Sequence, residues 1–209
     1  MYKLPTPILQ DIDTLYKGFN LPACQQDCGE KCQIYNPHHK PFCCDPEYAI
    51  PALFSIEYAQ LEQLTNLWLP AEPALPGDEP PEGMQLHRCL GPQHCQRDHR
   101  SISCRSFPFF PYVTSSYEFL GLVIEWQFRD VCWLANNLKE VDKAYKKQFI
   151  STYDQIFVQY QDVFDNYHEH SIRCRAAYSE SKTPLIVLHR NGKVYQIDPV
   201  SERRTNLIC

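Results

Sequence analysis

The chain has 209 residues, 44% of them hydrophobic, and a formal net charge of −5. This length allows a hydrophobic core that needs no disulfide staples, and no RNA- or DNA-binding signature accompanies the acidic balance. The seven glycines form no phosphate-binding loop, and we find no nucleophile elbow and no H-E-x-x-H motif. His168-Glu169-His170 lacks the spacing of a zinc motif and is expected at an exposed helix end.

The first 20 residues contain two lysines, two aspartates and two prolines, but no apolar stretch long enough for a signal-peptide core. A short amphipathic segment is expected from Ile8 to Phe19, ended by Asn20-Leu21-Pro22. The longest mostly apolar run, Phe119 to Ile124, is far too short to span a bilayer. We therefore expect a cytoplasmic protein without a membrane partner, whose thiols stay reduced.

Eight of the eleven cysteines fall into two groups between residues 24 and 104. Eleven is an odd number, so full pairing within the chain is impossible, and a reducing compartment favours metal ligands over disulfides. The Cys-x3-Cys-x3-Cys run indicates a soft metal, but it distinguishes poorly between zinc and iron or an iron–sulfur cluster such as [4Fe-4S]. The candidate ligands are Cys24, Cys28, Cys32, Cys43 and Cys44 in the first group, and Cys89, Cys95 and Cys104 in the second.

Histidines and arginines lie in the same region. The histidines are possible nitrogen ligands, although exposed loop histidines are the simpler interpretation because sulfur ligands already suffice. The arginines could offset the negative charge of a thiolate centre. Cys104 could instead be a nucleophile activated by Arg105, but within an array of thiols a ligand role is simpler. The histidines are His38, His39, His87, His94 and His99, and the arginines are Arg88, Arg97, Arg100 and Arg105.

The segments around the cysteines have distinct compositions. Residues 24–47 should be irregular and organised by the metal. Ser55 resembles a helix cap, and apolar periodicity predicts a helix through about Trp68. Residues 70–83 hold five prolines and four acids, which predict a mobile acidic loop within one domain. Residues 84–105 are expected to form the second metal-binding loop.

The second half of the chain shows regular patterns. A strand is expected from Tyr117 to Gln127, with Phe107 to Val113 leading into it. Steps of three and four between apolar residues predict a helix over 138–167, capped by Asn137 with Glu140. Its aromatic stripe is interpreted as core packing. The stripe comprises Tyr145, Phe149, Tyr153, Phe157, Tyr160, Phe164 and Tyr167.

The last predicted element is a β-hairpin over residues 185–198, in which Asn191-Gly192 is expected to form a type I′ turn. The tail from Val200 to Cys209 is expected to fray. Cys174 and Cys209 lie far from the two cysteine groups in sequence and are interpreted as unliganded thiols.

The stretch Cys89-x5-Cys95-x8-Cys104-Arg-Ser-Phe-Pro-Phe resembles the second half of the YkgJ-type cysteine-cluster family, which is described as a zinc- or iron-chelating domain. Arg100 falls at an arginine position of that family, and Ser101 replaces its proline. Cys28-Gly29 and Cys43-Cys44 look like stretched pieces of the family's first half. The resemblance spans roughly residues 24–132 and implies that Cys132 is a further metal ligand.

Together these patterns predict an α+β fold: a small, irregular, metal-nucleated cysteine-cluster domain with a long C-terminal helix and a terminal β-hairpin. Residues 1–135 would form the metal-binding domain, and residues 136–209 would pack on it. The expected function is binding of zinc or iron, with another protein as a further candidate partner and no nucleic acid. One relative of the resembled family is the flagellin lysine N-methylase, so the alternatives are a cluster-dependent transferase of that kind and an interaction module with structural zinc.

Overall fold

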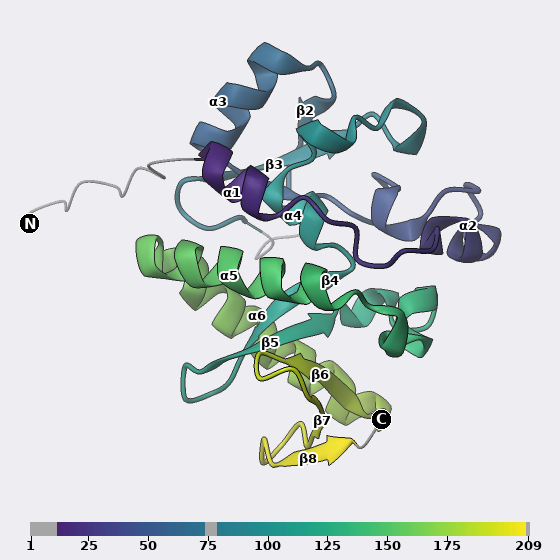
Figure 1. Ribbon diagram of the computed structural model, residues 1–209, viewed down its shortest axis with the longest axis vertical. Coiled ribbons are helices and arrows are strands. Elements are labelled where there is room, and N and C mark those ends of the chain that lie inside the picture. Colours follow the sequence, from purple (N-terminus) through teal and green to yellow (C-terminus); the bar gives the residue numbers. More distant parts are fainter. Residues whose placement is uncertain (1–11, 74–78, 208–209) are drawn as a thin grey trace, which may run out of the picture.

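The computed structural model describes residues 12–73 and 79–207. The fold is α+β, as the sequence predicts, with a three-stranded and a five-stranded sheet. Figure 1 shows the small sheet and helix α3 (Ser55–Leu64) at one end, strands β6 to β8 at the other, and the two longest helices between them. None of the described helices is both long and apolar enough to cross a membrane.

The small sheet is antiparallel, and its middle strand β3 ends at the first cysteine of the second group. Two predictions are wrong here. The helix that was expected to reach Trp68 ends at Leu64, because Thr65 is extended and Trp68 pairs with Cys89. The expected loop over 84–105 begins as a strand. The three strands are β1 (Ala52–Phe54), β2 (Trp68–Pro70) and β3 (Met84–Cys89).

The large sheet is also antiparallel, with its strands in chain order. The strand expected over residues 117–127 is present but ends at Ile124, because residues 126–128 form a short helical turn. The segment expected to lead into it is itself a strand, and the two form the first hairpin. The expected C-terminal hairpin is also present. The prediction of a fraying tail is wrong up to residue 207, because β8 pairs with β7 along its length. The strands are β4 (Phe109–Val113), β5 (Phe119–Ile124), β6 (Leu185–His189), β7 (Val194–Ile197) and β8 (Arg204–Leu207).

The turn between β6 and β7 differs from the type I′ turn that Asn191-Gly192 predicts. Gly192 has a positive φ of 86°, but Asn191 does not, whereas a type I′ turn needs both. The Gly192 amide donates to the His189 carbonyl, and the His189 amide donates to the Lys193 carbonyl, both at 2.9 Å. This arrangement is a turn followed by a glycine bulge, and the loop is therefore one residue longer than predicted.

The expected long C-terminal helix is two helices, α5 (Lys143–Gln159) and α6 (Gln161–Ser181). They meet at Tyr160, whose φ of −130° and ψ of 89° interrupt the helical backbone. The cap is Asp142, which accepts from two backbone amides of the first turn, so the predicted Asn137 cap is wrong. The aromatic stripe packs in the core as predicted. Its most buried members are Tyr145, Phe149 and Tyr153.

The cysteine-rich part is built from short helical segments joined by irregular chain. Residues 24–47, which were expected to be irregular, contain three short helical segments joined by irregular chain, and their organisation by a metal stays a prediction. Residues 74–78 of the expected acidic loop lie outside the described part. The expected N-terminal amphipathic segment is helix α1 in its described portion. The segments are α1 (Ile12–Gly18), α2 (Cys28–Cys32), η1 (Gln33–Tyr35), η2 (Phe42–Cys44), η3 (Pro92–His94), η4 (Arg97–His99), α4 (Ile102–Ser106), η5 (Trp126–Phe128), η6 (Trp133–Asn136) and η7 (Leu138–Glu140).

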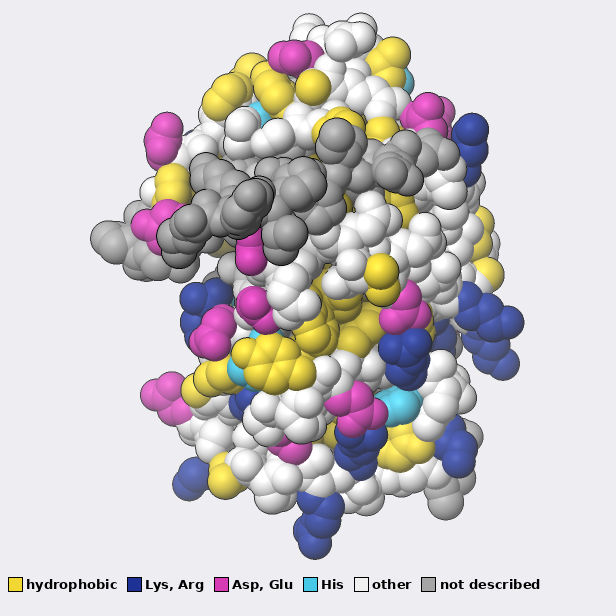
Figure 2. All heavy atoms as spheres, turned by 90° about the vertical axis from the view of Figure 1, so that its left-hand side faces the viewer, with side chains coloured by type: hydrophobic (Ala, Val, Ile, Leu, Met, Phe, Trp, Pro, Cys, Tyr) yellow, Lys and Arg dark blue, Asp and Glu magenta, His cyan; other side chains and the backbone are white. Residues whose placement is uncertain are grey.

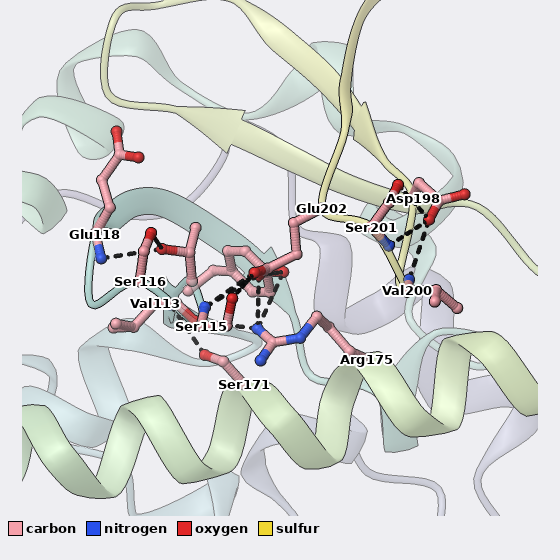
Figure 3. A network of polar contacts seen from close by, with 12 residues as sticks. Val113, Ser115, Ser116, Glu118, Ser171, Arg175, Asp198, Val200, Ser201 and Glu202 are labelled. Atoms are coloured by element: carbon pink, nitrogen blue, oxygen red, sulfur yellow. Dashed lines mark hydrogen bonds and ion pairs between the residues drawn. The ribbon is translucent and has the colours of Figure 1, made fainter.

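A buried ion pair holds the turn before β8 against α6 and the first hairpin of the large sheet. Arg175 Nη1 lies 2.9 Å from Glu202 Oε1, and both side chains are largely buried. Glu202 also accepts from the Tyr112 hydroxyl at 3.1 Å and the Ser115 amide at 3.0 Å (Figure 3). These contacts explain why the C-terminal segment is ordered although its sequence has no strong strand pattern.

On the face shown in Figure 2, acidic and basic side chains are interspersed, and hydrophobic side chains line a hollow at mid-height. The described residues of this face therefore carry no continuous patch of one charge.

Candidate metal centre

Cysteines from both sequence groups line one small cavity. Pro51, Trp68 and Phe107 contribute much of its apolar wall. The cavity volume is about 20 Å³, which is room for about one water-sized body. The two groups therefore meet in space, although the acidic segment separates them in the sequence. The cysteines of this cavity are Cys43, Cys44, Cys89, Cys95 and Cys104.

Four short elements hold these cysteines, and Cys43 and Cys44 share one of them, η2. Cys44 ends η2, Cys89 ends β3, Cys95 follows η3, and Cys104 lies in α4. The Gly91 amide donates to Cys89 Sγ at 3.4 Å, which is the kind of contact that stabilises a thiolate.

Two further hydrogen bonds fix the loop between Cys95 and Cys104. Ser101 caps α4, accepting from the Cys104 amide at 3.1 Å. The Trp68 indole donates to the His99 carbonyl at 3.0 Å, which anchors this loop to β2. The backbone around the cavity is thus positioned by contacts within the protein itself.

Arg105 has a role that the sequence did not reveal. Its guanidinium donates to the carbonyls of Phe19 and Asp98, both at 2.7 Å, and to that of Arg100 at 2.8 Å. It also lies over the Tyr16 ring, 4.4 Å from the ring centre. This largely buried arginine therefore ties the second cysteine loop to the N-terminal segment. The hydrogen bonds of its guanidinium go to backbone carbonyls, so its position differs from the expected role of offsetting the charge of a thiolate.

Arg100 is better placed to offset negative charge, because it lines the cysteine cavity. The pKa of Cys44 is lowered to about 7, mainly by the hydrogen bond with Cys43 and also by the charges of Arg100 and Arg97, against the opposing effect of burial. Burial raises the pKa of the neighbouring Cys104. The cavity thus contains one thiol that ionises easily beside others that need a cation to do so.

The remaining cysteines of the predicted set, Cys24, Cys28, Cys32 and Cys132, lie in or against two hydrophobic clusters outside this cavity. Cys24 is buried in the largest hydrophobic cluster, and Cys28 and Cys132 pack against that cluster. Cys132 also packs against a smaller cluster that contains Cys32. Burial, followed by the neighbouring thiols of Cys24, Cys132 and Cys32, raises the pKa of Cys28. Cys43 lies between the cavity and this second group. Its hydrogen bond with Cys44 and its burial raise its pKa, and the nearby thiols of Cys28 and Cys132 raise it as well.

The described cysteines are all free thiols. The alternative of a disulfide framework therefore has no bridge among these residues. The sulfurs of Cys43 and Cys44 are 4.0 Å apart. Within residues 12–73 and 79–207, no three His, Cys, Asp or Glu side chains are already placed so that they could hold a metal ion. Closing a shell around an ion would require rotations about χ1, which move a thiol while the backbone stays in place.

The candidate histidines lie outside the cavity wall. His38 Nδ1 is 2.8 Å from Oδ2 of the buried Asp45, and His99 Nδ1 is 2.7 Å from Gln96 Oε1. His87 is buried against the Tyr58 ring. The expectation of exposed loop histidines is confirmed for His38, His39 and His94, whereas His99 is half-buried. It is wrong for His87, which is buried on β3.

Cys174 is completely buried in a separate hydrophobic cluster of α6 and the large sheet, far from the other thiols in the fold. Cys209 lies outside the described residues. The expectation that His168-Glu169-His170 forms an exposed helix end is wrong, because these residues lie in the middle of α6. His168 is buried and stacked on Tyr117.

A larger pocket of about 410 Å³ adjoins the cysteine cavity, and Pro51 and Phe107 line both. His170 Nε2 lies 2.9 Å from Glu125 Oε2 in its wall, and Trp126 packs against the His170 ring. No sequence pattern indicates this pocket, because its walls come from segments that are distant in the chain.

Comparison of the chain with protein-family models, with curated proteins and with solved structures found no match. The resemblance to the YkgJ-type family therefore stays a prediction from the sequence motifs.

Proposed function

We propose that this protein binds a soft divalent metal ion, zinc in the first place, through the thiolates of Cys44, Cys89, Cys95 and Cys104. The observation that carries the proposal is that these four free thiols, from distant segments, line one small cavity. Four thiolates complete the tetrahedral shell that zinc prefers in structural sites, with sulfurs about 2.3 Å from the ion.

The surroundings suit a charged thiolate centre. Four thiolates and one divalent cation carry a net charge near −2, which Arg100 and the Gly91 amide would partly offset. The apolar walls would limit access of water and of competing ligands. The volume of about 20 Å³ favours a single ion over an iron–sulfur cluster, because a cube of four irons and four sulfides is much larger than one water molecule.

A metal at this cavity would cross-link η2, β3, η3 and α4, which are short elements with little regular hydrogen bonding between them. A structural zinc contributes on the order of 10 kcal/mol to folding at neutral pH. We therefore propose a role in which the ion holds this part of the fold together. The free cysteines also favour a reducing compartment such as the cytoplasm.

The test is the metal content of protein purified under reducing conditions. We expect bound zinc, and a sulfur-to-metal charge-transfer absorbance when Co²⁺ replaces it. Cys104→Ala should abolish binding at this cavity, whereas Cys174→Ala, which removes a buried thiol from a separate cluster, should leave binding unchanged. Protein that folds normally and takes up neither metal would refute the proposal.

A second candidate function is catalysis beside the metal, as in the cluster-dependent transferase alternative. The observation that favours it is the adjoining pocket of about 410 Å³, which shares Pro51 and Phe107 with the cysteine cavity and holds the Glu125–His170 pair. Visible absorbance of protein purified without oxygen would support a cluster and this alternative. Colourless protein with stoichiometric zinc would count against it.

A further inference from the structure

We infer that the protein has a second, separate metal centre, formed by Cys24, Cys28 and Cys132 with a fourth thiol from Cys32 or Cys43. This inference rests on the proposed function, because it assumes that cysteines of this chain ligate metal. It adds that eight of the nine candidate cysteines divide between two ions, and that either Cys32 or Cys43 is not a ligand.

Packing brings these thiols together from two parts of the chain. Cys28 and Cys32 begin and end α2 and are four residues apart, so they share one face of that helix. Lys31 of the same helix lies over the Trp133 ring, 3.9 Å from the ring centre, so α2 packs against η6. Cys132 immediately precedes η6 and is its N-cap residue.

Cys24 is held in the same place by the start of α5. The Asp142 amide donates to the Ala23 carbonyl at 2.9 Å, and the Gln25 side chain donates to Asp142 Oδ2 at 2.8 Å. Cys24 is 5% exposed and belongs to the cluster against which Cys28 and Cys132 pack. A single buried thiol such as Cys174 is ordinary core packing, but several thiols from distant segments that are buried in one place are the arrangement that a structural metal ion cross-links.

The two centres have different walls. The first cavity is bounded by Trp68, Pro51 and Phe107, and Cys24, Cys28 and Cys132 do not line it. The second group is packed on the large core that contains α5. The Cys43-Cys44 dipeptide lies at the boundary, with Cys44 in the first cavity and Cys43 beside both groups.

Accessibility should distinguish the two ions. Cys24 and Cys32 are 5% and 6% exposed, whereas Cys95 of the first cavity is exposed. A chelator in solution should therefore remove the first ion faster than the second. The release of metal should show two kinetic phases of equal amplitude.

The experiment is native mass spectrometry of the full chain loaded with Zn²⁺, combined with alkylation during chelation. We expect two zinc ions per chain, with Cys89, Cys95 and Cys104 alkylated in the fast phase and Cys24, Cys28 and Cys132 in the slow phase. Cys132→Ala should lower the count from two to one and abolish the slow phase, and Cys95→Ala should abolish the fast phase. The alkylation pattern of the unsubstituted protein keeps the test valid if a variant fails to fold.

One zinc ion per chain, protected from alkylation only at the first cavity, would overturn the second centre and leave the proposed function intact. A single ion whose removal exposes both sets at one rate would also overturn it. A chain that binds no Zn²⁺ would refute both proposals.

Discussion

Replacing Arg105 tests how the second cysteine loop is positioned. We expect Arg105→Met, which keeps much of the side-chain volume, to loosen the contact between residues 97–105 and the N-terminal segment. The guanidinium donates three short hydrogen bonds, at 2.7, 2.7 and 2.8 Å, to the carbonyls of Phe19, Asp98 and Arg100. Methionine can donate none of them.

The magnitude follows from these contacts. A hydrogen bond to a charged donor contributes about 1.5–3 kcal/mol, and carbonyls near the surface recover part of this from water. Phe19 is fully buried, so its carbonyl has little access to solvent. We therefore expect Arg105→Met to lower the free energy of unfolding by about 3–5 kcal/mol, a large part of the total for a domain of this size.

The assay is urea unfolding of the zinc-loaded protein, followed in parallel by limited proteolysis. Proteolysis should cut first in the loop around residues 97–101, and zinc should dissociate faster. The matched control is Arg88→Met, because Arg88 is an exposed arginine on β3 and should change stability by no more than about 0.5 kcal/mol. An Arg105→Met protein within about 1 kcal/mol of the wild type, with unchanged zinc release, would refute this reasoning.

Three further perturbations test other parts of the fold. Gly121→Ala should destabilise the protein by about 3 kcal/mol in thermal unfolding. Gly121 has a φ of +148°, and a Cβ there would lie 2.2 Å from the Leu188 carbonyl oxygen. A stable variant would show that β5 and β6 pair differently. Glu202→Ala should cost about 3 kcal/mol by leaving Arg175 buried without its partner, and the Arg175→Met/Glu202→Ala double variant should recover part of this; additive losses would contradict the coupling. Burial raises the pKa of Glu57 from 4.5 to about 7, so its stabilising contribution is full below pH 4.5 and is lost as the pH rises to about 7, a change of about 3 kcal/mol. Urea midpoints measured across this range should fall in the wild type and not in Glu57→Gln, and parallel curves would contradict the assignment.

The sequence predicted those elements whose signals are local. The strands on either side of residue 115, the C-terminal hairpin and the core position of Tyr145, Phe149 and Tyr153 follow from hydrophobic periodicity, and the structure contains them. Periodicity alone could not locate the break at Tyr160, because the apolar spacing continues through it into α6. It also could not show that β8 is ordered, since Arg175 and Glu202, far apart in sequence, hold the turn before it.

The residue types of the candidate site could be predicted from the sequence, but the separation of its cysteines into two groups in space could not. Cysteine spacing and composition indicated a soft-metal site, and the two sequence groups do meet at one cavity. Sequence spacing suggested that Cys24, Cys28 and Cys32 belong with Cys44, yet the fold places them on the core beside Cys132. That separation arises from the packing of α2 against η6, which no local pattern encodes.

The most direct test of the central claim is the amount of zinc that stays bound to the purified, reduced protein after exhaustive buffer exchange, measured by elemental analysis together with a count of free thiols. We expect bound zinc, lost at the first cavity in Cys104→Ala and retained in full by Cys174→Ala. The thiols should be slow to react until a chelator is added. Folded wild-type protein with no bound metal and fully reactive thiols would contradict the claim that these cysteines are metal ligands.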